Sequence, residues 1–179
     1  MVRIFVAIDL PDPLRRVLSE VQEPLRSISG RLAIVDPSLL HITLRFLGEV
    51  PLDRVPVIIA ALRSVCFNPY EIDIRGISAN NLDRPRVIWA EVEDGGETAA
   101  LAEQIEDAIS PLGFSREMRP FRSHITLARV KEFHPDHRYA ILPLSSWCGG
   151  RIMVSQFVLK KSTLTPAGPI YETIAEVPL

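Results

Sequence analysis

The sequence predicts an α+β fold of two pseudo-symmetric lobes, each a mostly antiparallel sheet with helices on its outer face. The tetrapeptide His-Ile-Thr-Leu at residues 41–44 recurs letter for letter at residues 124–127. The same offset aligns Pro37 with Pro120 and other strand-like segments of the two halves. Each half therefore reads as strand, helix, His-x-Thr strand and further strand, which indicates an internal duplication.

In the first half, residues 3–7 (Arg-Ile-Phe-Val-Ala) form a β-rich run. A helix follows, with Asp12 as its expected N-cap and Pro13 at the first helical position. Its apolar residues recur at helical spacing as far as Leu25, and Pro24 predicts a kink or a break. Beyond the first His-x-Thr strand, the pattern predicts a helix over residues 53–65 and a strand over residues 70–78.

In the second half, the strand at residues 86–90 aligns with residues 3–7 at the same offset. A helix is predicted near residues 97–110, with Gly113 just beyond its end. Residues 134–148 read as a loop. The chain closes with strands at 152–159 and 170–176, joined by a turn through Pro-Ala-Gly-Pro at 166–169. We expect residues 1–179 to form a single bilobal domain with repeat halves at roughly 1–83 and 84–179, and exchange of strands between the lobes stays open.

The composition narrows the class of protein. The net charge is −2 and 47% of the 179 residues are hydrophobic, which argues against disorder and against a uniformly basic nucleic-acid coat. The sequence lacks the long apolar run of a membrane span, and its N-terminus is too charged for a secretory signal, so we expect a cytoplasmic protein without a membrane partner. Cys66 and Cys148 are far apart, which favours a reducing compartment, and their apolar neighbours predict buried thiols. A monomer is expected.

The two His-x-Thr strands predict a shared functional groove. Alternation along a strand turns His41 and Thr43 to one face and the intervening Ile to the other, and the same holds for His124 and Thr126. A pseudo-twofold relation between the halves would bring the two polar faces together across a central groove. That groove would hold two imidazoles and two hydroxyl groups.

Two imidazoles point to acid–base chemistry on a phosphate. Neither motif contains a carboxylate or a Cys, and one neutral and one protonated His can act together as base and acid. All but three of the 20 cationic residues are Arg, whose planar fork suits phosphate. Five cations crowd around the second His: Arg116, Arg119, Arg122, Arg129 and Lys131. Together these residues predict phosphoryl transfer without a metal.

In combination, these motifs resemble the 2H phosphoesterases, and more narrowly the RNA 2′,3′-cyclic phosphodiesterases, historically called 2′-5′ RNA ligases. The resemblance includes residues 3–11 (Arg-Ile-Phe-Val-Ala-Ile-Asp-Leu-Pro), residues 40–48 and 121–129 around the two motifs, and residues 161–171 near the end. Where many members have Trp before the first motif this chain has Ile34 or a near neighbour, and Leu39 replaces a common Asn. These departures concern base contacts in the first lobe.

The resemblance implies hydrolysis of a ribose 2′,3′-cyclic phosphate to a 2′-phosphate, on RNA ends or small nucleotides and without a cofactor. It implies His41 as general acid and His124 as general base, with Thr43 and Thr126 on the phosphate oxygens. Arg129 is a further phosphate ligand by resemblance, although strict alternation turns it toward the core unless the strand ends or bulges. Alternation itself favours Arg122. Phe5 and Phe46 could stack a base, with core packing the expected role of both.

The sequence gives less support to several alternative kinds of site. His134, Asp136 and His137 could ligate a metal, but they lack a fixed third partner and lie in a polar turn. Neither Gly-Gly pair has the Lys and helix of a P-loop, and neither Cys has the context of a nucleophile. A non-catalytic module that binds RNA ends, or a ligase that forms 2′-5′ junctions, stays open. The same His pair can activate a 5′-hydroxyl in place of water.

Overall fold

The computed structural model describes residues 1–166 and 168–179. Within these residues, nine strands form one sheet in the order β7-β4-β5-β6-β3-β1-β8-β9, with β2 paired to β6. The strands are β1 (Val2–Asp9), β2 (Arg31–Ile34), β3 (His41–Val50), β4 (Tyr70–Ala79), β5 (Val87–Glu93), β6 (His124–Glu132), β7 (Cys148–Val154), β8 (Gln156–Thr165) and β9 (Gly168–Pro178). The α-helices are α1 (Asp12–Arg26), α2 (Val55–Leu62), α3 (Glu97–Ile109) and α4 (Asp136–Ile141).

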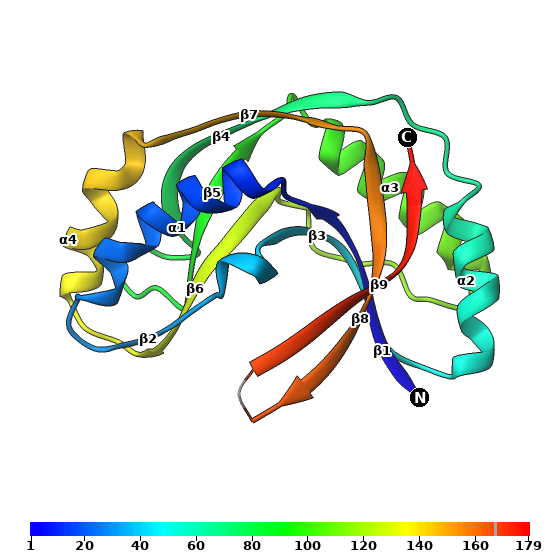
Figure 1. The fold of residues 1–179 in the computed structure, drawn as a ribbon, viewed down its shortest axis with the longest axis horizontal. Helices are drawn as coiled ribbons and strands as arrows, with labels where there is room; N and C mark the ends of the chain where they lie inside the picture. Colours follow the sequence, from blue (N-terminus) through cyan, green and yellow to red (C-terminus); the bar gives the residue numbers. More distant parts are fainter. Residues whose placement is uncertain (167) are drawn as a thin grey trace.

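The sheet divides into two lobes that meet at the His-x-Thr strands. Every strand pair among the described residues is antiparallel, and β3 meets β6 at the single pair Ile42–Ile125. One lobe holds β3, β1, β8 and β9 beside α2 and α3, and the other holds β6, β5, β4, β7 and β2 beside α1 and α4 (Figure 1). The predicted α+β fold with two antiparallel lobes is confirmed, and the lobes share one continuous sheet.

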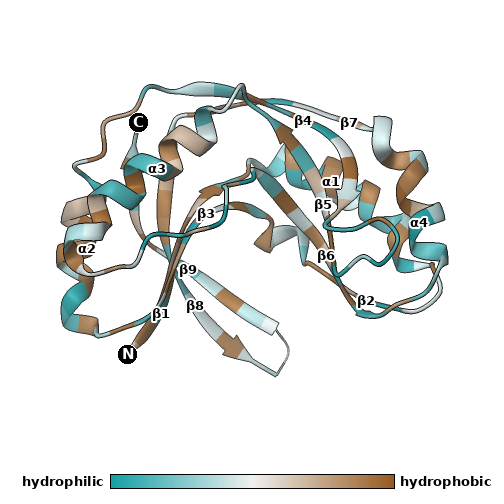
Figure 2. Ribbon diagram, turned by 180° about the vertical axis from the view of Figure 1, so that it is seen from behind, coloured by the Kyte–Doolittle hydropathy of each residue, from teal (hydrophilic) through white to brown (hydrophobic). Residues whose placement is uncertain are grey.

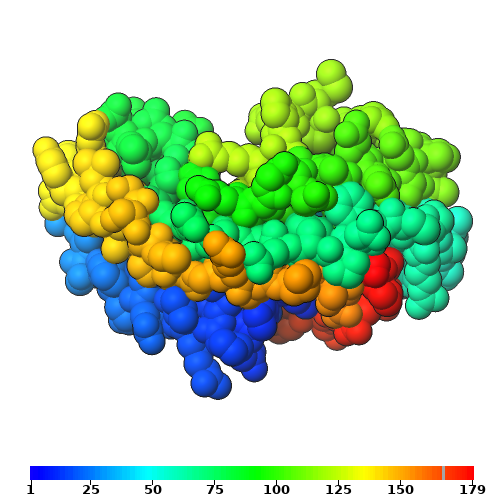
Figure 3. All heavy atoms as spheres, turned by 90° about the horizontal axis from the view of Figure 1, so that it is seen from above, coloured from blue at the N-terminus to red at the C-terminus, as the bar shows by residue number. Residues whose placement is uncertain are grey.

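Strands from the two repeat halves pair with each other. β4, from the first half, pairs with β5 of the second, and β8, from the second half, pairs with β1 of the first. The helices follow the same exchange, since α1 packs on the lobe of β6 and α3 packs against α2 and β3. Figure 3 shows early and late segments side by side at both ends of the molecule. The groove between the lobes is therefore built by both halves jointly.

The core follows the alternation that the motifs predict. Ile42, Ile125 and Leu127 are completely buried, and Leu44 is 5% exposed. Strand β1 carries apolar residues on both faces, with residues 4–8 buried between β3 and β8, and it is drawn mostly in brown in Figure 2. Such burial on both faces is typical of a central strand. The pairing of β1 with β3 anchors the first His-x-Thr strand within the sheet.

Helix α1 differs from the prediction at its start and at its proline. The N-cap residue is Pro11, and Asp12 lies inside the first turn, where its charge still suits the helix dipole. The expectation of Asp12 as N-cap is therefore wrong by one residue. The helix continues through Pro24 to Arg26, because the buried Val21 and Leu25 on either side hold this turn against the core.

The remaining elements follow the predictions more closely. Helix α3 at Glu97–Ile109 lies within its predicted range, and α2 at Val55–Leu62 is preceded by the 3₁₀ turn Leu52–Arg54. The expected strand 152–159 is interrupted, since β7 ends at Val154 and β8 begins at Gln156. The chain changes there from pairing with β4 to pairing with β1.

Two further predictions are corrected, and part of a third lies outside the described residues. The expected loop at 134–148 contains α4 and the 3₁₀ turn Leu142–Ser146, because the short helix buries His137 and Ile141 against the lobe. Cys66 and Cys148 are exposed, since Cys66 lies in the loop between α2 and β4 and Cys148 is the first residue of β7. Of the predicted 166–169 turn, Ala167 lies outside the described residues.

No helix in the described part of the chain is long and apolar enough to span a membrane.

Candidate active site

The two His-x-Thr motifs line one groove. Ile42 and Ile125 lie opposite each other across β3 and β6, with both side chains in the core. The antiparallel register at this pair places His41 next to Thr126, and Thr43 next to His124, on the opposite face. All four residues line a groove of about 1280 Å³, together with Arg122 and Arg129. The structure thus brings together every residue predicted for the site.

A β-bulge places Arg129 in the groove. Strand β5 pairs Ile88 with Ala128 and Trp89 with Thr126, which leaves Leu127 without an opposing residue. Leu127 and Ala128 are consecutive and both completely buried, so the alternation shifts by one residue after the bulge. Arg129 then faces the same side as Thr126, which resolves the conflict between the family resemblance and strict alternation.

The first repeat has the matching bulge with a different residue beyond it. Strand β1 pairs Val6 with Arg45 and Ala7 with Thr43, which leaves Leu44 unpaired. Phe46 then occupies the repeat position of Arg129, lines the groove, and is 51% exposed. Its ring lies 5.4 Å from that of Phe5, which is 1% exposed. The predicted role in core packing is therefore confirmed for Phe5 and wrong for Phe46.

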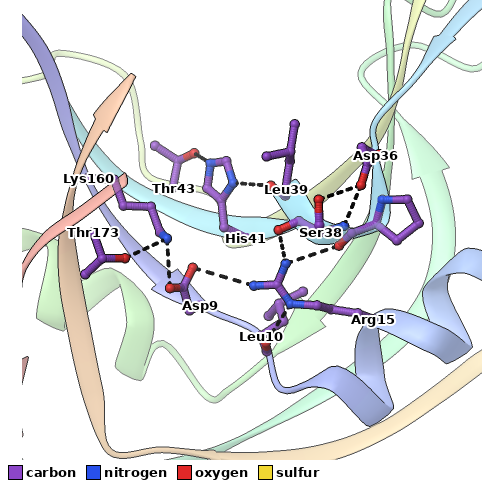
Figure 4. A network of polar contacts seen from close by, with 11 residues as sticks. Asp9, Leu10, Arg15, Asp36, Ser38, Leu39, His41, Thr43, Lys160 and Thr173 are labelled. Atoms are coloured by element: carbon purple, nitrogen blue, oxygen red, sulfur yellow. Dashed lines mark hydrogen bonds and ion pairs between the residues drawn. The ribbon is translucent and has the colours of Figure 1, made fainter. Parts of the chain in front are cut away.

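His41 is held in one orientation (Figure 4). Its Nδ1 lies 2.7 Å from the carbonyl oxygen of Leu39 and its Nε2 lies 3.0 Å from Oγ1 of Thr43. Because a carbonyl can only accept, Nδ1 carries the proton and the Nε2 lone pair faces Thr43. The rings of Phe5 and Tyr171 lie 5.1 Å and 5.5 Å from the imidazole. Burial among these groups lowers the pKa of His41 below its ordinary value of 6.5.

His124 has the same orientation with different neighbours. Its Nδ1 lies 2.8 Å from the carbonyl oxygen of Arg122, two residues upstream as in the first motif. Its ring centroid is 5.1 Å from that of Trp89. The guanidinium of Arg122 stacks 4.9 Å above the Trp89 ring and pairs with Oε1 of Glu91 at 2.6 Å. Arg122 therefore lies at the groove as predicted, with its charge already engaged by a carboxylate.

Each His has a carboxylate across the strand that sequence reasoning missed. Asp9 lies opposite His41 on β1, and Glu91 lies opposite His124 on β5. His41 and His124 are 83 residues apart, whereas their partners Asp9 and Glu91 are 82 residues apart, so the predicted alignment of residues 3–7 with 86–90 is wrong by one residue. The shorter offset superimposes the two acidic residues. Comparing the two halves at this shorter offset would have revealed both carboxylates from the sequence.

The remaining cations near the second motif have different roles. Arg116 forms an ion pair with Asp107, and Arg119 lies at the rim of the groove. Lys131 is exposed near the end of β6. Arg129 lines the groove three residues beyond Thr126, and it forms no ion pair among residues 1–166 and 168–179.

The alternative metal site lies on α4, away from the groove. Nδ1 of His134 contacts Oδ2 of Asp136 at 3.3 Å, and Nδ1 of His137 accepts the backbone N–H of His134. The Nδ1 atoms of both histidines are therefore used within the turn itself, whereas Nε2 of His137 is buried without a hydrogen-bond partner among the described residues. Across the described residues, no three His, Cys, Asp or Glu side chains are grouped so that they could hold a metal ion.

Comparison with known proteins identifies the family. Residues 8–89 and residues 91–171 each match the family described as LigT like phosphoesterase. A relative from Archaeoglobus fulgidus, named RNA 2′,3′-cyclic phosphodiesterase, is 39% identical over 96% of this chain and 97% of its own length. One of the same name from Aeropyrum pernix is 36% identical over 89% and 93%.

Solved structures agree with this fold. A structure from Thermus thermophilus superimposes with a TM-score of 0.84 at 32% identity, covering 99% of this chain and 97% of that one. E. coli LigT in complex with 3′-AMP has a TM-score of 0.81 at 23% identity, covering 99% and 98%, and shows the same fold. Two matches of one family on the two halves, with relatives above 30% identity along nearly the whole chain, show that this chain belongs to the LigT-like phosphoesterase family.

Proposed function

We propose that this chain hydrolyses the 2′,3′-cyclic phosphate at RNA ends to a 2′-phosphate, by metal-independent acid–base catalysis with His41 and His124. The observation that carries the proposal is that both His-x-Thr motifs line one groove, each with its His ring anchored through Nδ1. Nε2 of His124 is then available to the groove, and Nε2 of His41 lies at the groove 3.0 Å from Oγ1 of Thr43, to which it can donate when the ring is protonated. A pair of facing imidazoles suits an in-line displacement at phosphorus, in which one group takes a proton and the other gives one.

In this mechanism His124 acts as the base and His41 as the acid. Nε2 of His124 takes a proton from a water molecule whose oxygen attacks phosphorus. The bond from phosphorus to the 3′-oxygen breaks, and that oxygen takes the proton from Nε2 of His41. Burial lowers the pKa of His41 in the free protein, but the negative phosphate of a bound substrate favours the imidazolium form. The products are a 2′-phosphate and a free 3′-hydroxyl group.

The phosphate oxygens would be held by Thr43, Thr126 and Arg129. The two hydroxyl groups lie on the groove face beside the opposite repeat's His, so each can donate to a non-bridging oxygen as charge develops there. Arg129 brings a guanidinium that is not engaged by a carboxylate among the described residues. Arg122, paired with Glu91, would contribute by holding its own carbonyl against His124.

The nucleobase would stack on Phe46. Its exposed ring lies at the groove and rests on the buried ring of Phe5, so stacking requires little rearrangement. The relatives' name, RNA 2′,3′-cyclic phosphodiesterase, supports the substrate, and the complex of E. coli LigT with 3′-AMP supports a nucleotide ligand for this fold. We therefore propose RNA ends or small nucleotides with this cyclic phosphate as the partners of the groove.

The test is turnover of a cyclic-phosphate nucleotide by His41→Ala and His124→Ala. Each variant should lose about two to four orders of magnitude in kcat, the usual contribution of a general acid or base. The matched control is His134→Ala, because His134 is partly exposed on the α4 turn, away from the groove. Near-normal turnover in either groove variant would overturn the assignment of these two residues.

Chelation separates this mechanism from a metal-dependent one. With EDTA present, the unmodified protein should keep its turnover, since the proposed proton transfers use only the two imidazoles. Loss on chelation, restored by a divalent ion, would refute the metal-independent mechanism. Binding of the substrate without turnover would instead identify a non-catalytic module that binds RNA ends.

A further inference from the structure

Arg15 joins three parts of the chain behind His41. Its Nε donates to the carbonyl oxygen of Leu10 at 2.8 Å, and its Nη1 donates to the carbonyls of Pro37, at 3.2 Å, and Ser38. These contacts connect α1 and the end of β1 to the 3₁₀ turn Pro37–Leu39 that directly precedes β3 (Figure 4). The side chain is only 16% exposed.

The turn that Arg15 binds is the one that orients His41. Leu39 is its last residue, and the carbonyl of Leu39 accepts the Nδ1 proton of His41 at 2.7 Å. Asp36 caps the start of the turn by accepting the N–H of Ser38 at 2.8 Å. The carbonyl of Pro37 also accepts the N–H of Leu40 at 3.3 Å, a long hydrogen bond that closes the turn but does not tie it to the rest of the fold. Arg15 fixes the carbonyls of Pro37 and Ser38 from the side of the helix.

The guanidinium is suited to this task by charge and shape. Asp9 lies on its far side, with Oδ1 3.8 Å from Nη2, and Lys160 holds the other oxygen of Asp9 at 2.9 Å. Arginine stays charged, and its rigid fork can reach several carbonyls in one plane. Arg15 does not belong to the lining of the groove, so it can act on the substrate only through the turn and His41.

We propose that Arg15 is a positioning residue for His41, which fixes the turn Pro37–Leu39 so that Nδ1 keeps its proton and Nε2 faces the groove. The second lobe offers a parallel. There the carbonyl that anchors His124 belongs to Arg122, whose own side chain is fixed by Trp89 and Glu91. In both lobes an arginine immobilises the segment that carries the carbonyl partner of the imidazole.

The effect on kinetics rests on the proposed function, whereas the effect on the His41 ring does not. The test therefore has two readouts on Arg15→Met and Arg15→Lys, with Arg16→Met as the matched control on the exposed side of the same helix. The first readout is the ¹⁵N NMR spectrum of the His41 ring nitrogens. The second is kcat and KM on a 2′,3′-cyclic-phosphate nucleotide.

We expect the unmodified protein and Arg16→Met to show one His41 tautomer with the proton on Nδ1. Arg15→Met should show a mixture of tautomers and lose kcat on the order of 100-fold at an unchanged KM, as expected for a misplaced catalytic group. Arg15→Lys keeps the positive charge and the buried aliphatic stem but lacks the planar guanidinium. Its kcat should therefore lie between that of the unmodified protein and that of Arg15→Met.

Two results would overturn the inference. One is a single Nδ1–H tautomer with unchanged kcat in both Arg15 variants. The other is a fall in kcat without any change in the tautomer, which would leave Arg15 with a role other than orienting His41. If the unmodified protein does not turn over the nucleotide, the proposed function fails. The NMR comparison still decides the role of Arg15.

Discussion

Gln22 of α1 should be essential to the bulge that turns Arg129 into the groove. Its side chain is completely buried, and its Nε2 donates to the carbonyls of Val35, at 2.8 Å, and Leu127, at 3.0 Å. Leu127 is the unpaired residue of the β6 bulge. The perturbation is Gln22→Met, which keeps the volume of the side chain and removes both donors.

The expected cost follows from the contacts that remain. The carbonyl of Leu127 keeps the N–H of Val35 at 2.9 Å, so its loss is small, whereas the part-buried carbonyl of Val35 loses its donor from Gln22. An unpaired buried carbonyl costs about 1–3 kcal/mol. Oε1 of Gln22 is itself buried without a hydrogen-bond partner among the described residues. Because Gln22→Met also removes this unpaired oxygen, part of the lost stability is recovered. The free energy of unfolding should fall by about 2 kcal/mol.

Urea unfolding measures this change directly. With a slope near 2 kcal/mol per M, the midpoint should fall by about 1 M. The control is Gln104→Met, an exposed position on α3 that should shift the midpoint little. KM for the cyclic-phosphate nucleotide should also rise, because the bulge positions Arg129. A Gln22→Met midpoint equal to that of the control would refute this role for Gln22.

Three other predictions address the core, the phosphate site and pH. Ile42→Ala should lower the free energy of unfolding by about 2–5 kcal/mol, since the side chain is completely buried, while Ile170→Ala, at 54% exposure, should change it by less than about 0.5 kcal/mol in the same urea titration. Arg129→Gln should raise KM about tenfold or more while Lys131→Gln leaves it unchanged, because a charged hydrogen bond is worth about 1.5–3 kcal/mol; equal KM values would contradict the phosphate role. Burial lowers the pKa of His41, so between that value and 6.5 the unfolded chain binds more protons and stability should fall as pH falls, a dependence that His41→Gln should reduce in unfolding curves from pH 7 to pH 5.

The repeat could be predicted from the sequence because identical motifs mark equivalent strands. Strand periodicity then placed His41, Thr43, His124 and Thr126 on one face, and the structure confirms that they line one groove. These inferences depend on local alternation, which the backbone imposes wherever a strand is regular.

Features that depend on pairing between distant segments were not predictable in the same way. The bulge at Leu127 is set by the register between β5 and β6, and sequence alternation alone gave the wrong face for Arg129. The carboxylates of Asp9 and Glu91 were missed for the same reason, because their strands follow a different offset from the motifs. Arg15 reaches the turn before His41 through the backbone carbonyls of Pro37 and Ser38, and contacts with carbonyls leave no residue pattern.

The short helix α4 was missed because its composition resembles a polar turn. His134, Pro135 and Asp136 are common in loops, and the buried face of α4 consists of His137 and Ile141 alone. With so few apolar residues, helical periodicity is too brief to detect. The helix lies near β4 and is stabilised by the burial of these two side chains.

The central claim concerns the reaction in the groove, and the nature of the product tests it most directly. An oligonucleotide with a 2′,3′-cyclic phosphate is incubated with the protein in EDTA, and ³¹P NMR identifies the phosphate ester that forms. We expect a 2′-phosphomonoester with a free 3′-hydroxyl group, because His41 is assigned to protonate the 3′-oxygen. A 3′-phosphate, or a 2′-5′ joined product in place of hydrolysis, would contradict the account.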